Sequence, residues 1–188
     1  MKTALILGRA KGLFEEIAAA QAMVKFDYVL ATGPMVVDDP GEVDCWVWFH
    51  TELFKDIAER RARNGHPPVK SYWSVKYKGH VRGGHTLNIN YLEWNGGGAS
   101  GLVATLIALR ELKVDRVALA GIPMTPEGGQ YDSNKIWKEA KVHRQAWINI
   151  LPELIGTVRS FSGWTLDLLE DKPPTAAWLR GEPELAVA

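Results

Sequence analysis

Residues 95–124 read NGGGASGLVATLIALRELKVDRVALAGIPM, and this stretch decides the fold class of the chain. A glycine-rich loop precedes a helical pattern of apolar residues over 102–112. A short turn then leads into the apolar run 116–120, which predicts a buried strand that ends at Gly121. A helix followed closely by a buried strand is typical of α/β proteins with a parallel sheet.

Strands and helices alternate along the rest of the chain as well. Further strands are predicted at residues 3–7, 26–31, 44–49, 69–75 and 157–161, and a short extended stretch lies among loops at 86–90. Helices are predicted at 12–23, 51–63 and 134–150, with one or two helical turns at 165–170. This alternation predicts an α/β, Rossmann-like, doubly wound and mainly parallel sheet with helices on both faces. We expect one such domain over residues 1–170 and a proline-containing surface tail over 171–188.

Composition excludes several classes of protein. The 188 residues carry 22 basic and 22 acidic side chains, so the formal net charge is zero, which disfavours binding of nucleic acid through overall charge. Cys45 is the single cysteine, which excludes an intramolecular disulfide and a cysteine-rich zinc site. No apolar run approaches the roughly 18 residues of a membrane span, so we expect a cytoplasmic protein of a bacterium or phage-infected cell, without a membrane partner. The chain has eight tryptophans, more than a core of this size needs.

The loops that follow the predicted strands are the candidate binding site, because open parallel sheets bind ligands at the carboxyl ends of their strands. Glycines let backbone N–H groups approach an anion, and the following helix adds its positive end. The predicted nucleotide-binding residues are Gly8, Arg9, Lys11, Gly12, Thr32, Gly97, Gly98, Ala99, Ser100, Gly101 and Gly121. No Lys-Ser/Thr pair follows the glycines, so the stretch is not a P-loop. The alternative is a glycine-rich turn that only packs a helix against the sheet.

His50 is the candidate catalytic residue, because it follows the third predicted strand and stands beside a helix start. A lone histidine in such a place can also be purely structural. Four residues of the strand-end loops are predicted to contact the substrate or to form a lid: Trp94, Met124, Tyr131 and Trp164. Trp137 and Trp147 are ten residues apart and are expected to share one helical face that packs on the sheet. Asp38 and Asp39 favour a solvated turn over a divalent metal site, so no metal is expected.

A family resemblance covers most of the chain. The segments that carry it are 4–8 (ALILG), 43–52 (VDCWVWFHTE), 97–104 (GGASGLVA), 114–124 (VDRVALAGIPM) and 158–165 (VRSFSGWT). The sequence resembles an uncharacterised Rossmann-like family of phages and proteobacteria. It is more distantly similar to the Campylobacter-type sialyltransferases and to motility-accessory/hydroxymethylpterin pyrophosphokinase-like proteins.

The resemblance implies where a nucleotide would be held. In the sialyltransferases the Ser/Thr-Gly helix start contacts the nucleotide of a CMP-sugar, which implies such contacts at Ala99, Ser100 and Gly101. The chain departs from those relatives in two places. Pro123 stands where they often carry an acidic residue, and Thr32-Gly33 stands where their second strand commonly ends in Asn.

These observations predict a protein that binds a nucleotide or nucleotide-sugar and acts as a glycosyltransferase-like group transferase. Beyond such a donor no cofactor is firmly implied, and a homo-oligomer is left open. One alternative is a non-catalytic phage interaction or assembly protein that uses the indoles of Trp94 and Trp164 as anchors. A second is a nucleic-acid base-modifying transferase, because basic and aromatic residues share the run 70–82. Lysines that protect an edge strand explain the same run.

Overall fold

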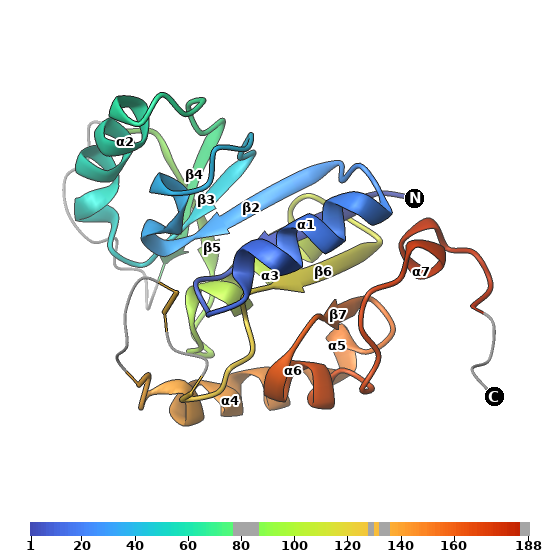
Figure 1. Ribbon diagram of the computed structural model, residues 1–188. Coiled ribbons are helices and arrows are strands. Elements are labelled where there is room, and N and C mark those ends of the chain that lie inside the picture. The colour runs from blue at the N-terminus through green and yellow to red at the C-terminus, as the bar shows by residue number, and fades with distance from the viewer. Residues whose placement is uncertain (77–86, 128–129, 132–135, 185–188) are drawn as a thin grey trace.

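A computed structural model describes residues 1–76, 87–127, 130–131 and 136–184 of the chain. Within these residues the strands form one seven-stranded sheet in the order β5-β4-β3-β2-β1-β6-β7, and every neighbouring pair is parallel (Figure 1). The strands are β1 (Thr3–Leu7), β2 (Tyr28–Thr32), β3 (Cys45–Val47), β4 (Ser71–Lys76), β5 (Ile89–Glu93), β6 (Arg116–Ala120) and β7 (Val158–Ser160). The predicted Rossmann-like α/β fold is confirmed.

Helices cover both faces of the sheet, and the strands supply a hydrophobic core on each side. The helices are α1 (Leu13–Met23), α2 (Phe54–Arg63), α3 (Ser100–Arg110), α4 (Ala140–Asn149), α5 (Leu151–Leu154), α6 (Gly163–Leu168) and α7 (Ala176–Arg180), with short 3-10 helices η1 (Gly33–Val37) and η2 (Thr51–Leu53). Successive strand residues point to opposite faces. Ala4 and Ile6 of β1 therefore pack in the core of α3, α4 and α5, whereas Leu5 and Leu7 pack in that of α1, α2 and α7.

The direction of the chain reverses at the centre of the sheet. β1 lies between β2 and β6, so the chain leaves β1 toward one edge and returns through α3 to β6. In Figure 1, α1 crosses in front of these central strands. The loops after β1 and β6 lead to helices on opposite faces, which opens a crevice between their carboxyl ends.

Three elements differ from the prediction. The extended stretch expected at 86–90 is the edge strand β5, which begins at Ile89, so β4 is an inner strand. Two lysines at the ends of β4 form ion pairs with carboxylates. Lys70, which precedes the strand, pairs with Glu42 and Asp44, and Lys76, its last residue, pairs with Glu93. The rest of the run 70–82, from residue 77 on, lies outside the described residues. The helix expected from 134 begins at Ala140, so Trp137 precedes it and does not share its face with Trp147.

The carboxyl-terminal segment carries a helix of its own. Trp178 of α7 is 5% exposed and packs against two guanidinium groups: that of Arg116 lies 5.3 Å from the ring centroid and that of Arg159 lies 4.6 Å from it. The amino terminus lies close to α7 (Figure 1). A boundary between domain and tail at residue 170 stays a prediction. Among the described residues, no helix has the length and hydropathy needed to cross a lipid bilayer.

Candidate functional site

A cavity of about 700 Å³ opens at the carboxyl ends of the central strands. This volume lies within the range of small-molecule binding sites, about 300–1,000 Å³. Five segments far apart in the sequence line it: Gly8–Ala10, Thr32–Pro34, Trp48–His50, Gly98–Gly101 and Gly121–Thr125, together with Gln130, Trp137 and His143. Ten of the predicted site residues therefore lie around one cavity: Gly8, Arg9, Thr32, His50, Gly98, Ala99, Ser100, Gly101, Gly121 and Met124.

The backbone of Gly8 touches that of Gly121 at the floor of the crevice. The Gly8 N–H donates to the carbonyl of Ala120 at 2.7 Å, and the N–H groups of Arg9 and Ala10 both donate to the carbonyl of Gly121 at 3.0 Å. A Cβ atom on Gly8 would lie 2.0 Å from that carbonyl oxygen. Gly121 itself has a φ of +66°, which glycine adopts without strain. Glycine at both positions is therefore what allows the two strand ends to meet.

These hydrogen bonds limit which groups of the loop after β1 can contact a ligand. The N–H groups of Arg9 and Ala10 are already used by Gly121, so they are not available to an anion. Lys11 and Gly12 are exposed and do not line the cavity. The loop after β1 thus contributes the backbone of Gly8 and the half-buried side chain of Arg9 to the cavity.

The amino end of α3 forms another wall. Gly98 has a φ of +89°, which favours glycine, and a Cβ there would meet the Leu102 side chain at 2.8 Å. Ser100 and Gly101 begin the helix, where N–H groups have no intrahelical acceptor and carry the positive end of the helix dipole. Within the described residues, neither these two N–H groups nor the Ser100 hydroxyl form a hydrogen bond. Gly97, predicted to bind, is exposed and lies outside the cavity lining.

The ionisable side chains of the cavity favour an anion. Among the described lining residues, Arg9 carries a permanent positive charge, His50 and His143 can gain one, and Asp and Glu are absent. Thr32 lines the cavity, but its hydroxyl is buried and donates to the carbonyl of Leu7 at 2.8 Å, so it ties β2 to β1. A negatively charged ligand therefore meets a positive charge and no carboxylate among the described lining residues, although Glu16 and Glu52 each contact one of these residues from outside the lining.

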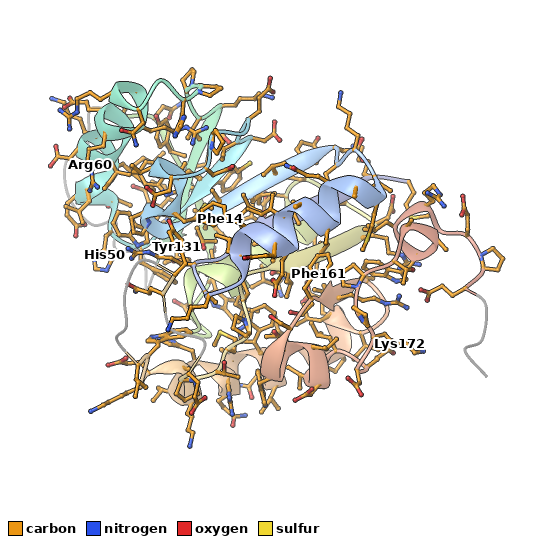
Figure 2. The ribbon with its side chains drawn as sticks, viewed as in Figure 1. Phe14, His50, Arg60, Tyr131, Phe161 and Lys172 are labelled. Atoms are coloured by element: carbon orange, nitrogen blue, oxygen red, sulfur yellow. The ribbon has the colours of Figure 1, made fainter. Side chains whose placement is uncertain are left out.

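His50 lies at the rim, three residues after the end of β3. Its Nδ1 atom is 3.1 Å from Oε1 of Glu52, and its ring packs edge-on against Trp48 with centroids 5.2 Å apart. The imidazole is about half exposed, and Figure 2 labels it. A histidine in this setting can exchange a proton with a bound molecule.

Trp137 and His143 form a wall that the sequence analysis did not assign to the site. Their rings are stacked with centroids 5.6 Å apart and an interplanar angle of 28°, and both line the cavity. The Trp137 N–H donates to the carbonyl of Pro126 at 3.0 Å, which holds the loop before α4 over the end of β6. The sequence analysis missed this pair because it predicted a helix from residue 134, and in such a helix Trp137 would face the sheet.

Of the four predicted substrate or lid residues, only Met124 lines the cavity. Tyr131 lies beside the cavity. The Tyr131 N–H donates to the carbonyl of Arg9, a lining residue, at 2.9 Å, and the Tyr131 ring packs against Phe14 (Figure 2). Trp94 and Trp164 lie outside the lining. The Trp94 indole donates to the carbonyl of Gly97 at 2.6 Å.

The two indoles outside the cavity are each covered by an arginine. Arg110 lies 5.5 Å from the centroid of Trp94, and Arg144 lies 4.9 Å from that of Trp164. Both tryptophans are half-buried rather than projecting from the surface. These contacts stabilise each indole within the chain, and a role of the two residues as anchors for a partner stays a prediction.

Two charged residues that the sequence analysis did not single out support the cavity from behind. Glu16 of α1 accepts a hydrogen bond from the Gly121 N–H at 2.6 Å, and burial raises the pKa of this carboxyl group. Arg61 of α2 is 1% exposed, and burial lowers its pKa. Its guanidinium donates to four backbone carbonyls, those of Val36, Asp39, Gly41 and Pro67. The segment 33–41, whose first two residues line the cavity, is thereby fixed to α2.

Cys45 and Asp39 are both buried, so the solvated turn expected of the acidic pair holds for the exposed Asp38 and is wrong for Asp39. Cys45 is 3% exposed in β3, and burial raises the pKa of its thiol. Asp39 accepts from the Gly41 N–H at 3.1 Å, and Asp38 accepts from the Tyr131 hydroxyl at 2.5 Å. Among the described residues, no three His, Cys, Asp or Glu side chains gather as a metal site requires.

Comparison with protein-family models, with curated proteins and with solved structures gives no match to this chain. The fold alone does not specify an activity, since Rossmann-like sheets host many chemistries. A functional assignment therefore rests on the cavity and on the residues that line it.

Proposed function

We propose that the protein binds a nucleotide or nucleotide-sugar in this cavity and transfers a group from it, as a glycosyltransferase-like enzyme. One observation carries the proposal: a single cavity joins the amino end of α3, the guanidinium of Arg9 and a wall of aromatic side chains. Helix N–H groups and a guanidinium are the donors that phosphates prefer. Aromatic rings such as Trp137 suit the planar base.

In the proposed reaction His50 would act on the acceptor, whereas Arg9 and the amino end of α3 would act on the nucleotide phosphate. His50 would accept the proton of an acceptor hydroxyl while the acceptor oxygen forms a bond to the sugar carbon. The bond from that carbon to the phosphate oxygen would break, and its electron pair would remain on the nucleotide phosphate. Arg9 and the first N–H groups of α3 would stabilise the charge that develops there.

Isothermal titration of the protein with CMP, UDP, GDP and ATP tests the binding step. We expect at least one of these nucleotides to bind with a dissociation constant below the millimolar range, and Ser100→Trp to abolish that binding by filling the amino end of α3. Ala18→Trp is the matched control, because Ala18 is exposed on α1 and lies outside the cavity lining. Absence of binding at millimolar nucleotide, or binding that Ser100→Trp leaves unchanged, would rule the proposal out.

A further inference from the structure

The imidazole of His50 has its two nitrogens in different surroundings. Nδ1 faces Oε1 of Glu52 at 3.1 Å, while His50 lines the cavity and Glu52 does not. Trp48 packs edge-on against the same ring, with an interplanar angle of 64°. One nitrogen is therefore engaged away from the cavity, and the ring has a neighbour that limits its rotation.

We propose that Glu52 is a positioning residue that keeps neutral His50 protonated on Nδ1, so that Nε2 is the nitrogen that accepts a proton in the cavity. This inference rests on the proposed function, since it describes how the same site would activate an acceptor. A carboxylate accepts hydrogen bonds and donates none, so the neutral imidazole must present N–H on the side of Glu52. The two neutral tautomers of imidazole are close in free energy, and one charge-assisted hydrogen bond decides between them.

The tautomer determines whether His50 can act as a base. With the proton on Nδ1, the lone pair of Nε2 is free to take the proton of an acceptor hydroxyl, and Glu52 stabilises the imidazolium that results. With the proton on Nε2, the nitrogen on the cavity side is a donor and cannot accept. After transfer, the imidazolium returns its proton to water. Glu52 therefore acts through His50 and has no contact with the substrate.

Long-range nitrogen–proton NMR spectra of the histidine side chains, recorded at alkaline pH, test the assignment without any ligand. In the wild-type protein we expect His50 as the Nδ1–H tautomer. In Glu52→Ala we expect the Nε2–H tautomer, which predominates in free histidine, to become the major species. Glu52→Gln is expected to give a mixture of the two tautomers, because the amide can accept from Nδ1–H through its oxygen or donate to Nδ1 through its nitrogen. Glu59→Ala is the control, since it removes an exposed carboxylate of α2.

Two results would overturn the inference: a wild-type His50 that is mainly Nε2–H, or a tautomer that Glu52→Ala does not change. The outcome is separate from that of the nucleotide titrations. Failure of every nucleotide to bind rejects the proposed function while the tautomer measurement still decides the role of Glu52. Where turnover is measured, Glu52→Ala should lower kcat about tenfold or more at unchanged KM.

Discussion

Glu16 holds the backbone of Gly121, with its carboxylate Oε2 atom 2.6 Å from the Gly121 N–H. The contact joins the first helix to the end of β6, two segments that lie 105 positions apart in the sequence. Ser162, in the loop after β7, also donates to this carboxyl group. Burial raises the pKa of Glu16 despite both hydrogen bonds, so a partly desolvated charge lies directly behind the cavity floor.

The raised pKa of Glu16 predicts how Glu16→Gln changes stability with pH. A carboxyl group with a raised folded-state pKa contributes most to stability below its unfolded pKa, about 4.3, and loses that contribution as pH rises through the folded value. Glutamine does not titrate and still accepts from the Gly121 N–H. The free energy of unfolding of Glu16→Gln, measured in urea, should therefore improve relative to wild type between about pH 4 and pH 7. Glu111→Gln, on an exposed position, should show no such trend.

Much of this architecture follows from sequence, because parallel strands and their helices have strong local signals. The apolar runs at β1 and β6 and the glycines before α3 predict both the fold and one wall of the cavity. Trp137 and Glu16 lack such a signal. Trp137 lies in the cavity because the chain is held at Pro126, and Glu16 is defined by a contact with the distant Gly121. Tertiary contacts of this kind leave no periodic pattern in the sequence.

The lysines and indoles illustrate the same limit. Residues 70–82 carry basic and aromatic side chains, but the carboxylates that pair with Lys70 and Lys76 come from other segments. Trp94 and Trp164 follow strands, as ligand contacts do, yet each packs under an arginine. Position after a strand predicts the correct edge of the sheet, whereas the direction of a side chain at that edge depends on its neighbours.

Gly8→Ala should destabilise the protein strongly. The added Cβ would lie 2.0 Å from the Gly121 carbonyl oxygen and 2.5 Å from the Ile122 side chain, so the ends of β1 and β6 would have to separate. We expect a loss of about 3 kcal/mol, or about 6–12 °C in Tm, by differential scanning calorimetry. Gly65→Ala is the control, because nothing lies within 4 Å of its Cβ and only the φ of +77° is unfavourable, which costs about 1 kcal/mol. Similar losses for both variants would contradict the close contact.

Arg61→Leu should cost far more than Arg60→Leu. Arg61 is buried and donates to four carbonyls, so its removal leaves the two buried acceptors, those of Val36 and Asp39, without a donor. The expected loss is about 3–5 kcal/mol in the free energy of unfolding. Arg60 is exposed on the same helix, and its substitution should stay within about 0.5 kcal/mol. Urea denaturation followed by circular dichroism measures the free energy of unfolding of both variants. Equal losses would show that the four hydrogen bonds of Arg61 do not stabilise the protein.

Trp137→Phe should remove most of the fluorescence change that accompanies nucleotide binding. Trp137 lines the cavity, whereas Trp164 lies outside the lining beneath Arg144, so Trp164→Phe is the matched control. Trp137→Leu should also weaken binding about 5- to 100-fold, since base stacking contributes about 1–3 kcal/mol. A titration in which Trp164→Phe loses the signal and Trp137→Phe keeps it would place the base elsewhere.

Glu184→Gln should uncouple the carboxyl-terminal segment from the sheet in a pH-dependent way. Glu184 accepts from both terminal nitrogens of Arg159, at 2.7 and 2.6 Å, and from the Thr175 hydroxyl at 2.5 Å. Arg159, followed by Thr175, lowers the pKa of Glu184 to about 2. A depressed folded-state pKa contributes stability above the unfolded pKa of about 4.3, and this stability is lost as pH falls toward 2.

The wild-type protein should therefore exceed Glu184→Gln by about 1 kcal/mol at neutral pH, a value kept small because the carboxylate is partly exposed to solvent. The difference in the free energy of unfolding should shrink as pH falls toward 2, where about half of the wild-type carboxylate is protonated. Glu182→Gln is the control, because the pair of Glu182 with Arg180 is half exposed and should contribute little. Urea denaturation at several pH values measures the difference, and a constant offset between Glu184→Gln and wild type from neutral pH to pH 2 would show that the ion pair with the buried Arg159 is not its source.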